Sequence, residues 1–83
     1  MEIMEIQIME KLLEILSELH SDVDFENTED LVDDGILDSL DIVTLVTEID
    51  AEFGVTIPAE EIIPENFNSA RALMELITRL DEE

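Results

Sequence analysis

The sequence has no cysteine, which excludes disulfide frameworks and thiolate nucleophiles. A single histidine, His20, excludes most zinc sites and most triad-type active sites. Lysine and arginine together contribute only three residues, so binding to nucleic acid or to an anionic membrane is not expected. No apolar run is long enough to span a bilayer, and acids follow Met1 where a signal peptide carries positive charge. We therefore expect an intracellular, cytoplasmic protein.

Acidic residues are abundant instead, with 24 aspartates and glutamates and a formal net charge of −21. Hydrophobic residues make up 46% of the 83 positions, more than a disordered acidic tail contains. We therefore predict that residues 1–83 form one small folded domain with the acids on its surface. Such a surface favours partners with basic patches. It also predicts that stability rises with salt, because ions screen the repulsion between the acids.

Apolar residues recur at helical spacing in three segments, which predicts helices over residues 3–18, over 39–53, and from 68 or 69 to about 80. A shorter helix is predicted from Pro58 to about Ile63, with Pro64 ending it. Residues 20–38 lack a fixed period, so we expect a long loop pinned onto the helices by its scattered apolar residues. No segment alternates strictly enough to form a strand. The predicted fold is all-α, a four-helix bundle with three longer helices and one short helix.

Each of the longer predicted helices has an apolar face that should form the core. Gly54 directly follows the second helix and is predicted to end it, while Gly35 is expected to supply a backbone angle that other residues adopt only with strain. The predicted inner faces are Leu40, Val43, Leu45, Val46, Ile49 and Phe53 in the second helix, and Leu73, Met74, Ile77 and Leu80 in the last.

The acidic stretch over residues 22–33 has the length of a calcium-binding loop but lacks its diagnostic residues. Asn27 stands at the sixth position, where such a loop needs glycine, and Asp33 at the twelfth, where it needs glutamate. We therefore expect no dedicated metal site, only weak binding of divalent ions. Pairs of carboxylates are inevitable in so acidic a chain, so they do not indicate catalysis, and we expect a protein that is not an enzyme. His20 follows the first predicted helix, where pairing with solvent or with the helix dipole is expected.

The most informative segment covers residues 33–41 and places Ser39 at the start of the second predicted helix. Asp38 or Ser39 can cap the free amides of its first turn, and Asp41 adds an acid beside the positive end of the helix dipole. No basic residue lies nearby in the sequence to activate the Ser39 hydroxyl, so this serine is not predicted to be a nucleophile. An exposed serine on a rigid helix end suits a different use, as the attachment point for a group that another protein adds.

The pattern Gly35-x-Leu37-Asp38-Ser39-Leu40, followed by an amphipathic helix that ends at Glu52-Phe53-Gly54 and then Ile57-Pro58, resembles the acyl carrier protein family. The resemblance covers roughly residues 5 to 80 and extends to helix order, size and acidity. It implies that a phosphopantetheinyl transferase attaches 4′-phosphopantetheine from coenzyme A to Ser39. The thiol of this arm would then carry an acyl or aminoacyl group as a thioester.

The resemblance also implies partners and a recognition surface. The expected partners are the transferase, a ligase that loads the acyl or aminoacyl group, and synthases and acyltransferases with basic surfaces, all meeting a monomeric carrier. The cargo is left open between fatty acyl, polyketide and aminoacyl groups, as in the D-alanyl carriers; Thr44 stands where fatty acid carriers usually have an acid. The implied partner-binding residues are Asp38, Leu40, Asp41, Glu48 and Asp50, and an attached chain could be sheltered by Val43, Val46, Phe53 and Ile62, whose primary role is the core.

Two alternatives come from other functional classes. The first is an acidic interaction protein or nucleic-acid mimic that binds a basic partner through charge alone, without a prosthetic group. The second is a calcium-responsive acidic bundle, which predicts a large structural change on binding calcium. Only the carrier interpretation needs Ser39, so substitution of that serine separates it from both.

Overall fold

The computed structural model describes residues 2–82 and contains only helices and connecting segments over that range. Its elements are α1 (Glu2–Leu19), α2 (Ser39–Phe53), a 3₁₀ turn η1 (Ala59–Glu61), α3 (Pro64–Phe67) and α4 (Ala70–Asp81). The all-α bundle is therefore confirmed, and the three longer predicted helices match α1, α2 and α4 to within two residues at each end. Met1 and Glu83, the ends of the predicted domain, lie outside the described residues.

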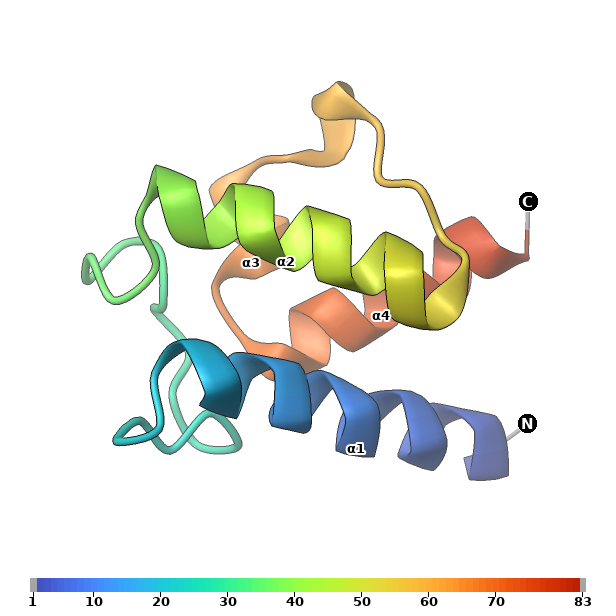
Figure 1. Ribbon diagram of the computed structural model, residues 1–83, viewed down its shortest axis with the longest axis horizontal. Coiled ribbons are helices and arrows are strands. Elements are labelled where there is room, and N and C mark those ends of the chain that lie inside the picture. The colour runs from blue at the N-terminus through green and yellow to red at the C-terminus, as the bar shows by residue number, and fades with distance from the viewer. Residues whose placement is uncertain (1, 83) are drawn as a thin grey trace.

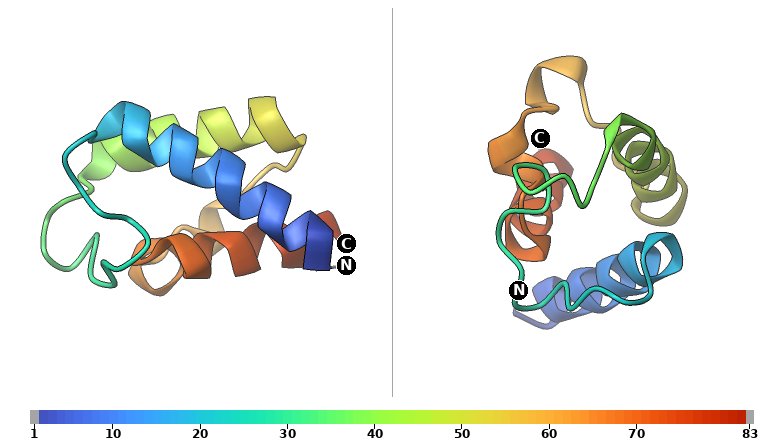
Figure 2. Two further views of the ribbon diagram at one scale, coloured as in Figure 1. Left: turned by 90° about the horizontal axis from the view of Figure 1, so that it is seen from below. Right: turned by 90° about the vertical axis from the view of Figure 1, so that its left-hand side faces the viewer.

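The three longer helices pack around a common core (Figures 1 and 2). Helix α1 runs antiparallel to α2, and α4 contacts α1, so both ends of the chain lie on the same side of the molecule (Figure 1). The start of α2 lies at the opposite end, beside the long loop. None of the described helices is long and apolar enough to cross a membrane.

The core consists of apolar side chains only; no polar or charged side chain is buried among the described residues. It draws on every longer helix, on the long loop and on α3. The buried residues are Leu12, Ile15, Leu16, Phe25, Leu31, Leu37, Leu45, Ile49, Val55, Ile57, Phe67, Ala70, Leu73, Leu76 and Ile77.

The loop over residues 20–38 is pinned to the bundle, as predicted. Phe25, Leu31 and Leu37 are buried in the core. Asn68, between α3 and α4, holds the middle of the loop, because its Oδ1 accepts hydrogen bonds from Val32 N–H at 2.9 Å and Asp33 N–H at 3.1 Å. The loop therefore has a defined path that delivers the chain to the start of α2.

The predicted short helix from Pro58 to Ile63 is wrong in detail. That segment forms only the 3₁₀ turn η1, and Pro64, expected to end a helix, begins α3 instead. A proline fits the first position of a helix because the amide it lacks would have had no partner there.

The predicted inner face of α2 is also partly wrong. Leu45 and Ile49 are buried, and Val46 and Phe53 are half-buried. Leu40 and Val43, however, are 74% and 62% exposed. Helical geometry explains the difference: Leu45 follows Val43 by two positions, which places them about 200° apart around the helix. The apolar residues of α2 thus surround most of the helix, and only one side of it meets the core.

In α4, Leu73 and Ile77 are buried, as predicted, and Met74 and Leu80 are half-buried. Leu76 is buried too, although it was not assigned to the predicted inner face.

Candidate functional site

Ser39 is the first residue of α2 and is exposed, but it is not the residue that caps the helix. Asp38 is the cap: its carboxylate accepts a hydrogen bond from Asp41 N–H at 2.9 Å, while Asp41 Oδ2 accepts one from Asp38 N–H at 3.2 Å. This reciprocal pair closes a capping box, which satisfies two backbone donors at the helix start. Of the two predicted caps, the structure therefore selects Asp38, and a capping role for the Ser39 hydroxyl is wrong.

The Ser39 hydroxyl has no hydrogen-bond partner among residues 2–82. It nevertheless sits on fixed backbone, because the capping box joins Asp38, immediately before it, to Asp41, two residues after it. No basic side chain in the described part of the chain contacts it, so nothing in this chain would deprotonate it. The hydroxyl is therefore positioned and accessible but not activated.

His20 reaches this helix start from the end of α1. Its Nε2 lies 2.8 Å from Asp41 Oδ2, and the pair is partly buried. The hydrogen bond to Asp41 raises the pKa of His20 above its ordinary value of 6.5, with burial opposing and the charges of Asp41, Asp22 and Asp38 assisting. The same bond lowers the pKa of Asp41. We predicted that His20 pairs with solvent or with the helix dipole. Its partner is instead the side chain of Asp41, 21 positions away.

An apolar cavity of about 330 Å³ opens beside Ser39. Its walls are almost entirely carbon, and Thr47, which also lines it, donates its hydroxyl proton to the Val43 carbonyl at 3.0 Å. Ile62, 38% exposed, lines the cavity from the segment between η1 and α3. The lining residues are Ser39, Ile42, Val43, Val46, Thr47 and Ile62.

Three of the four residues expected to shelter an attached chain, Val43, Val46 and Ile62, therefore line a cavity next to Ser39. The primary core role predicted for them is wrong for Val43 and Ile62, which are exposed. Phe53 does not line this cavity and lies at the other end of α2.

The exposed face of α2 is largely uncharged. Leu40 and Val43 project from it, and the hydroxyls of Thr44 and Thr47 are bonded to the carbonyls of Leu40 and Val43 at 2.9 and 3.0 Å. Bonding to the preceding turn occupies these hydroxyls. This surface therefore offers apolar contact directly beside the serine.

The five predicted partner-binding residues do not share one face. Asp38 and Asp41 form the capping box, and Leu40 and Asp50 are exposed. Glu48 is half-buried, and it lies on the same side of α2 as Asp41, since seven residues make nearly two helical turns. Asp50 and Leu40 lie toward the other side. The acids thus flank the apolar surface of α2 and do not cover it.

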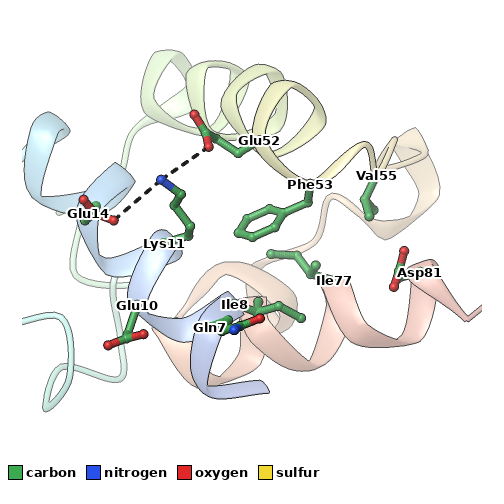
Figure 3. Close-up of a pocket in the computed structure, with 10 residues that line it drawn as sticks. All are labelled: Gln7, Ile8, Glu10, Lys11, Glu14, Glu52, Phe53, Val55, Ile77 and Asp81. Atoms are coloured by element: carbon green, nitrogen blue, oxygen red, sulfur yellow. Dashed lines mark ion pairs between the residues drawn. The ribbon is translucent and has the colours of Figure 1, made fainter. Parts of the chain in front are cut away.

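A larger cavity, about 560 Å³, lies at the opposite end of α2, between α1, α2 and α4 (Figure 3). Phe53 and Ile77 point toward each other across it, and Lys11 extends between two acids, 3.8 Å from Glu52 and 4.0 Å from Glu14. It shares no lining residue with the cavity at Ser39. No serine lines it, so its size does not make it an attachment site.

Among residues 2–82, no group of three or more histidines, aspartates or glutamates is arranged to hold a metal ion. The acids of the stretch over residues 22–33 are not gathered around a common point in that range.

Comparison with known proteins shows which family the chain resembles. Residues 7–77 match the family described as "Phosphopantetheine attachment site". The D-alanyl carrier protein of Streptococcus mutans is 38% identical over 74 residues, which cover 88% of this chain and 94% of the relative. The D-alanyl carrier proteins of Streptococcus suis and Streptococcus sanguinis are each 35% identical over the same shares of the two chains.

Proposed function

The chain belongs to the phosphopantetheine attachment-site family of carrier proteins, and from that premise we propose that Ser39 is the residue that bears its covalently attached 4′-phosphopantetheine. We propose further that the chain acts as one domain over residues 1–83, as a monomer and without catalytic activity of its own. Its role is to present cargo, held as a thioester on the arm, to other enzymes.

The assignment to Ser39 depends on one observation: an exposed hydroxyl without a hydrogen-bond partner stands on a restrained helix start and lines an apolar cavity. The chain has three other serines, Ser17, Ser21 and Ser69. Ser69 is half-buried and its hydroxyl caps α4 by accepting from Ala72 N–H at 3.0 Å. Ser17 and Ser21 are exposed, but neither lines the cavity beside Ser39 or the larger cavity at the other end of α2.

The site fits the prosthetic group chemically. The phosphate of the arm is an anion, and the free amides and dipole at the start of α2 favour an anion there, although Asp38 and Asp41 oppose it. Val43 and Ile62 offer carbon surface to the apolar part of the arm. When bound, the arm supplies the thiol that this cysteine-free chain lacks.

Attachment requires a partner that supplies the chemistry. The Ser39 oxygen attacks the phosphorus of coenzyme A that bears pantetheine; the new phosphoester forms as the bond to the nucleotide phosphate breaks, and the hydroxyl proton passes to a base. The described residues offer no base in contact with Ser39, so the phosphopantetheinyl transferase must provide it. A transferase with a basic surface would be attracted to the negative charge of this chain.

We propose an aminoacyl group as the cargo and a ligase that activates an amino acid as the loading partner. The support is the D-alanyl carrier proteins, which are 35–38% identical over most of this chain. A carrier for fatty acid biosynthesis or another route of lipid metabolism, or for polyketides, has no comparable support. The protein that carries the phosphopantetheine arm without cargo is incubated with ATP, D-alanine and a D-alanine-activating ligase. It should gain the mass of one alanyl residue. A gain in mass with a fatty acid and an acyl ligase, but none with D-alanine and its ligase, would contradict the aminoacyl proposal.

The attachment site is tested by intact mass after incubation with coenzyme A and a broad-specificity phosphopantetheinyl transferase. The wild type and Ser69→Ala should gain one phosphopantetheine, and Ser39→Ala should gain none. Ser69→Ala is a matched control because it also removes a serine hydroxyl at a helix start. If the wild type gains no mass with several transferases, Ser39 is not an attachment site, and an acidic protein that binds a basic partner without a prosthetic group becomes the better proposal.

A further inference from the structure

One carboxylate connects the end of α1 to the backbone immediately before Ser39. Asp41 Oδ2 lies 2.8 Å from His20 Nε2 and also accepts the Asp38 N–H at 3.2 Å. His20 itself is anchored at the end of α1, where its backbone N–H donates to the Leu16 carbonyl at 3.0 Å. The imidazole thus holds, from a neighbouring helix, the side chain that closes the capping box.

The geometry points to His20 as a positioning residue for the modification of Ser39: by holding the Asp41 carboxylate it keeps the capping box closed, and its protonation sets how firmly the backbone at Asp38 and Ser39 is restrained. The part that concerns modification rests on the function proposed above. The link between His20 and the backbone at Ser39 stands without it.

Protonation matters because it changes the strength of this bond. An imidazolium donates a charge-assisted hydrogen bond to the carboxylate, whereas a neutral imidazole donates a weaker one, and only in the tautomer that carries the proton on Nε2. The charged groups that face His20 are Asp41 and Asp38 at the start of α2 and Asp22 in the loop after α1, all of them acidic. They favour the protonated form, so the bond is strongest at mildly acidic pH and weakens as the imidazole loses its proton.

The consequence for Ser39 follows from its position. A loosened Asp41 releases the Asp38 N–H, and the first turn of α2 then frays more readily, since its remaining amides have no intrahelical acceptors. The hydroxyl would spend less time in the orientation that a transferase recognises. Because the restraint acts on positioning, its loss should slow modification without abolishing it.

The first experiment tests, in the unmodified protein, whether His20 is linked to the backbone at Ser39. In ¹H–¹⁵N NMR spectra recorded across a pH titration, His20 should titrate with a midpoint above 6.5, and the amide signals of Ser39 and Leu40 should shift with the same midpoint. In His20→Gln, which keeps an N–H donor but cannot titrate, these amides should lose that transition. In Asp41→Asn the midpoint of His20 should fall. Amides at Ser39 and Leu40 that ignore the titration of His20 would overturn the inference.

The second experiment measures how His20 affects the rate at which Ser39 is modified. Wild type and His20→Gln are mixed in equal amounts with limiting transferase and coenzyme A, and their initial rates are compared by intact mass. Because both chains share one enzyme, the pH dependence of the transferase cancels in the ratio. The wild type should be modified roughly twofold to fivefold faster near pH 6, and the ratio should approach one well above the His20 midpoint.

Lys11→Gln is the matched control, because Lys11 also links α1 to α2, but at the far end of α2, 3.8 Å from Glu52. Its ratio to wild type should stay near one at every pH. A flat ratio for His20→Gln, or an equal rise for Lys11→Gln, would overturn the positioning role even if Ser39 is modified. If neither chain gains mass, the proposed function and the positioning role both fail, while the NMR titration still decides whether His20 restrains the start of α2.

Discussion

The two ends of α2 are built differently. At its start, the stabilising interactions are polar: Asp38 and Asp41 cap each other's backbone, and His20 holds Asp41. The apolar residues there, Leu40 and Val43, are exposed. At its end, half-buried Phe53 faces Ile77 (Figure 3). Gly54, with φ of 67°, caps this end in a left-handed conformation.

The two ends differ both in what stabilises them and in what they expose to solvent. The end of α2 borders the larger cavity, which no serine lines. Phe53 at this end lines the cavity together with residues of α1 and α4. The start borders the smaller cavity and exposes both a free hydroxyl and apolar side chains. Burial therefore stabilises one end, while polar caps keep the other end ordered with its apolar surface in solvent.

The largest difference is expected from truncating one apolar residue at each end. Phe53→Ala should lower the free energy of unfolding by about 2 kcal/mol, less than for a fully buried phenylalanine, because Phe53 is half-buried. Val43→Ala should change it by less than about 0.5 kcal/mol, because Val43 is 62% exposed. Urea unfolding of the two variants measures both values. Equal losses would show that the two ends do not differ in packing.

The caps at the two ends should have similar and smaller effects. Asp38→Ala removes the acceptor for the Asp41 N–H and should destabilise by about 1 kcal/mol. Gly54→Ala should also cost about 1 kcal/mol, because it forces a side chain into the left-handed region although nothing lies within 4 Å of the new Cβ. Asp38→Asn keeps an acceptor and serves as the control in the same urea titrations. If Ser39→Ala destabilises the protein and Asp38→Ala does not, the cap has been assigned to the wrong residue.

The pair of His20 and Asp41 should make stability at the start of α2 depend on pH. The pKa of His20 is raised, so its contribution is complete below its ordinary value of 6.5 and is lost as pH rises through the raised pKa. The pKa of Asp41 is lowered, so its contribution is present above its ordinary value of 3.8 and is lost as pH falls through the lowered pKa. Wild type should therefore exceed His20→Gln most at mildly acidic pH.

The size of this effect should stay under about 1 kcal/mol, because the His20 side chain is 33% exposed and solvent screens the pair. Urea unfolding of wild type and His20→Gln at several pH values measures the difference. A difference that grows as pH rises above neutrality would contradict the raised pKa of His20.

The smallest effect is expected from Lys11→Gln at the far end of α2. The Lys11 side chain is 54% exposed and its pairs with Glu14 and Glu52 are long, so the loss should be less than about 0.5 kcal/mol. It should shrink further in high salt, whereas wild type itself should gain stability there, because screening relieves the repulsion among 24 acids. Thermal melts at low and high salt test both statements; a wild type that loses stability with salt would show that attractive pairs dominate.

Helical periodicity was sufficient to predict where the long helices lie, and local signals identified their ends. The bounds of α2 follow from its apolar spacing, from the acids at its start and from Gly54 at its end. The loop was predictable as a pinned segment because its apolar residues need burial, and Phe25, Leu31 and Leu37 obtain it. These features depend on neighbours a few residues apart, which the sequence lists directly.

The candidate site was predictable only in outline. The position of Ser39 at a helix start follows from the segment around it, but which of two adjacent residues caps the helix depends on backbone dihedral angles, and Asp38 has the extended conformation that a cap requires. The side of α2 that meets the core was also undetermined, because apolar residues occur nearly all around it. Leu40 and Val43 were therefore assigned to the wrong face.

The sequence by itself determined the three longer helices, the acidic character and the serine that fits the family's motif, because composition and local spacing encode each of them. Only the tertiary structure decided that Val43 and Ile62 face a cavity beside Ser39 and that His20 holds Asp41 across 21 positions. The physical reason is that such contacts arise from how the helices pack and where the loop returns the chain. They join residues whose separation along the sequence gives no sign of their proximity.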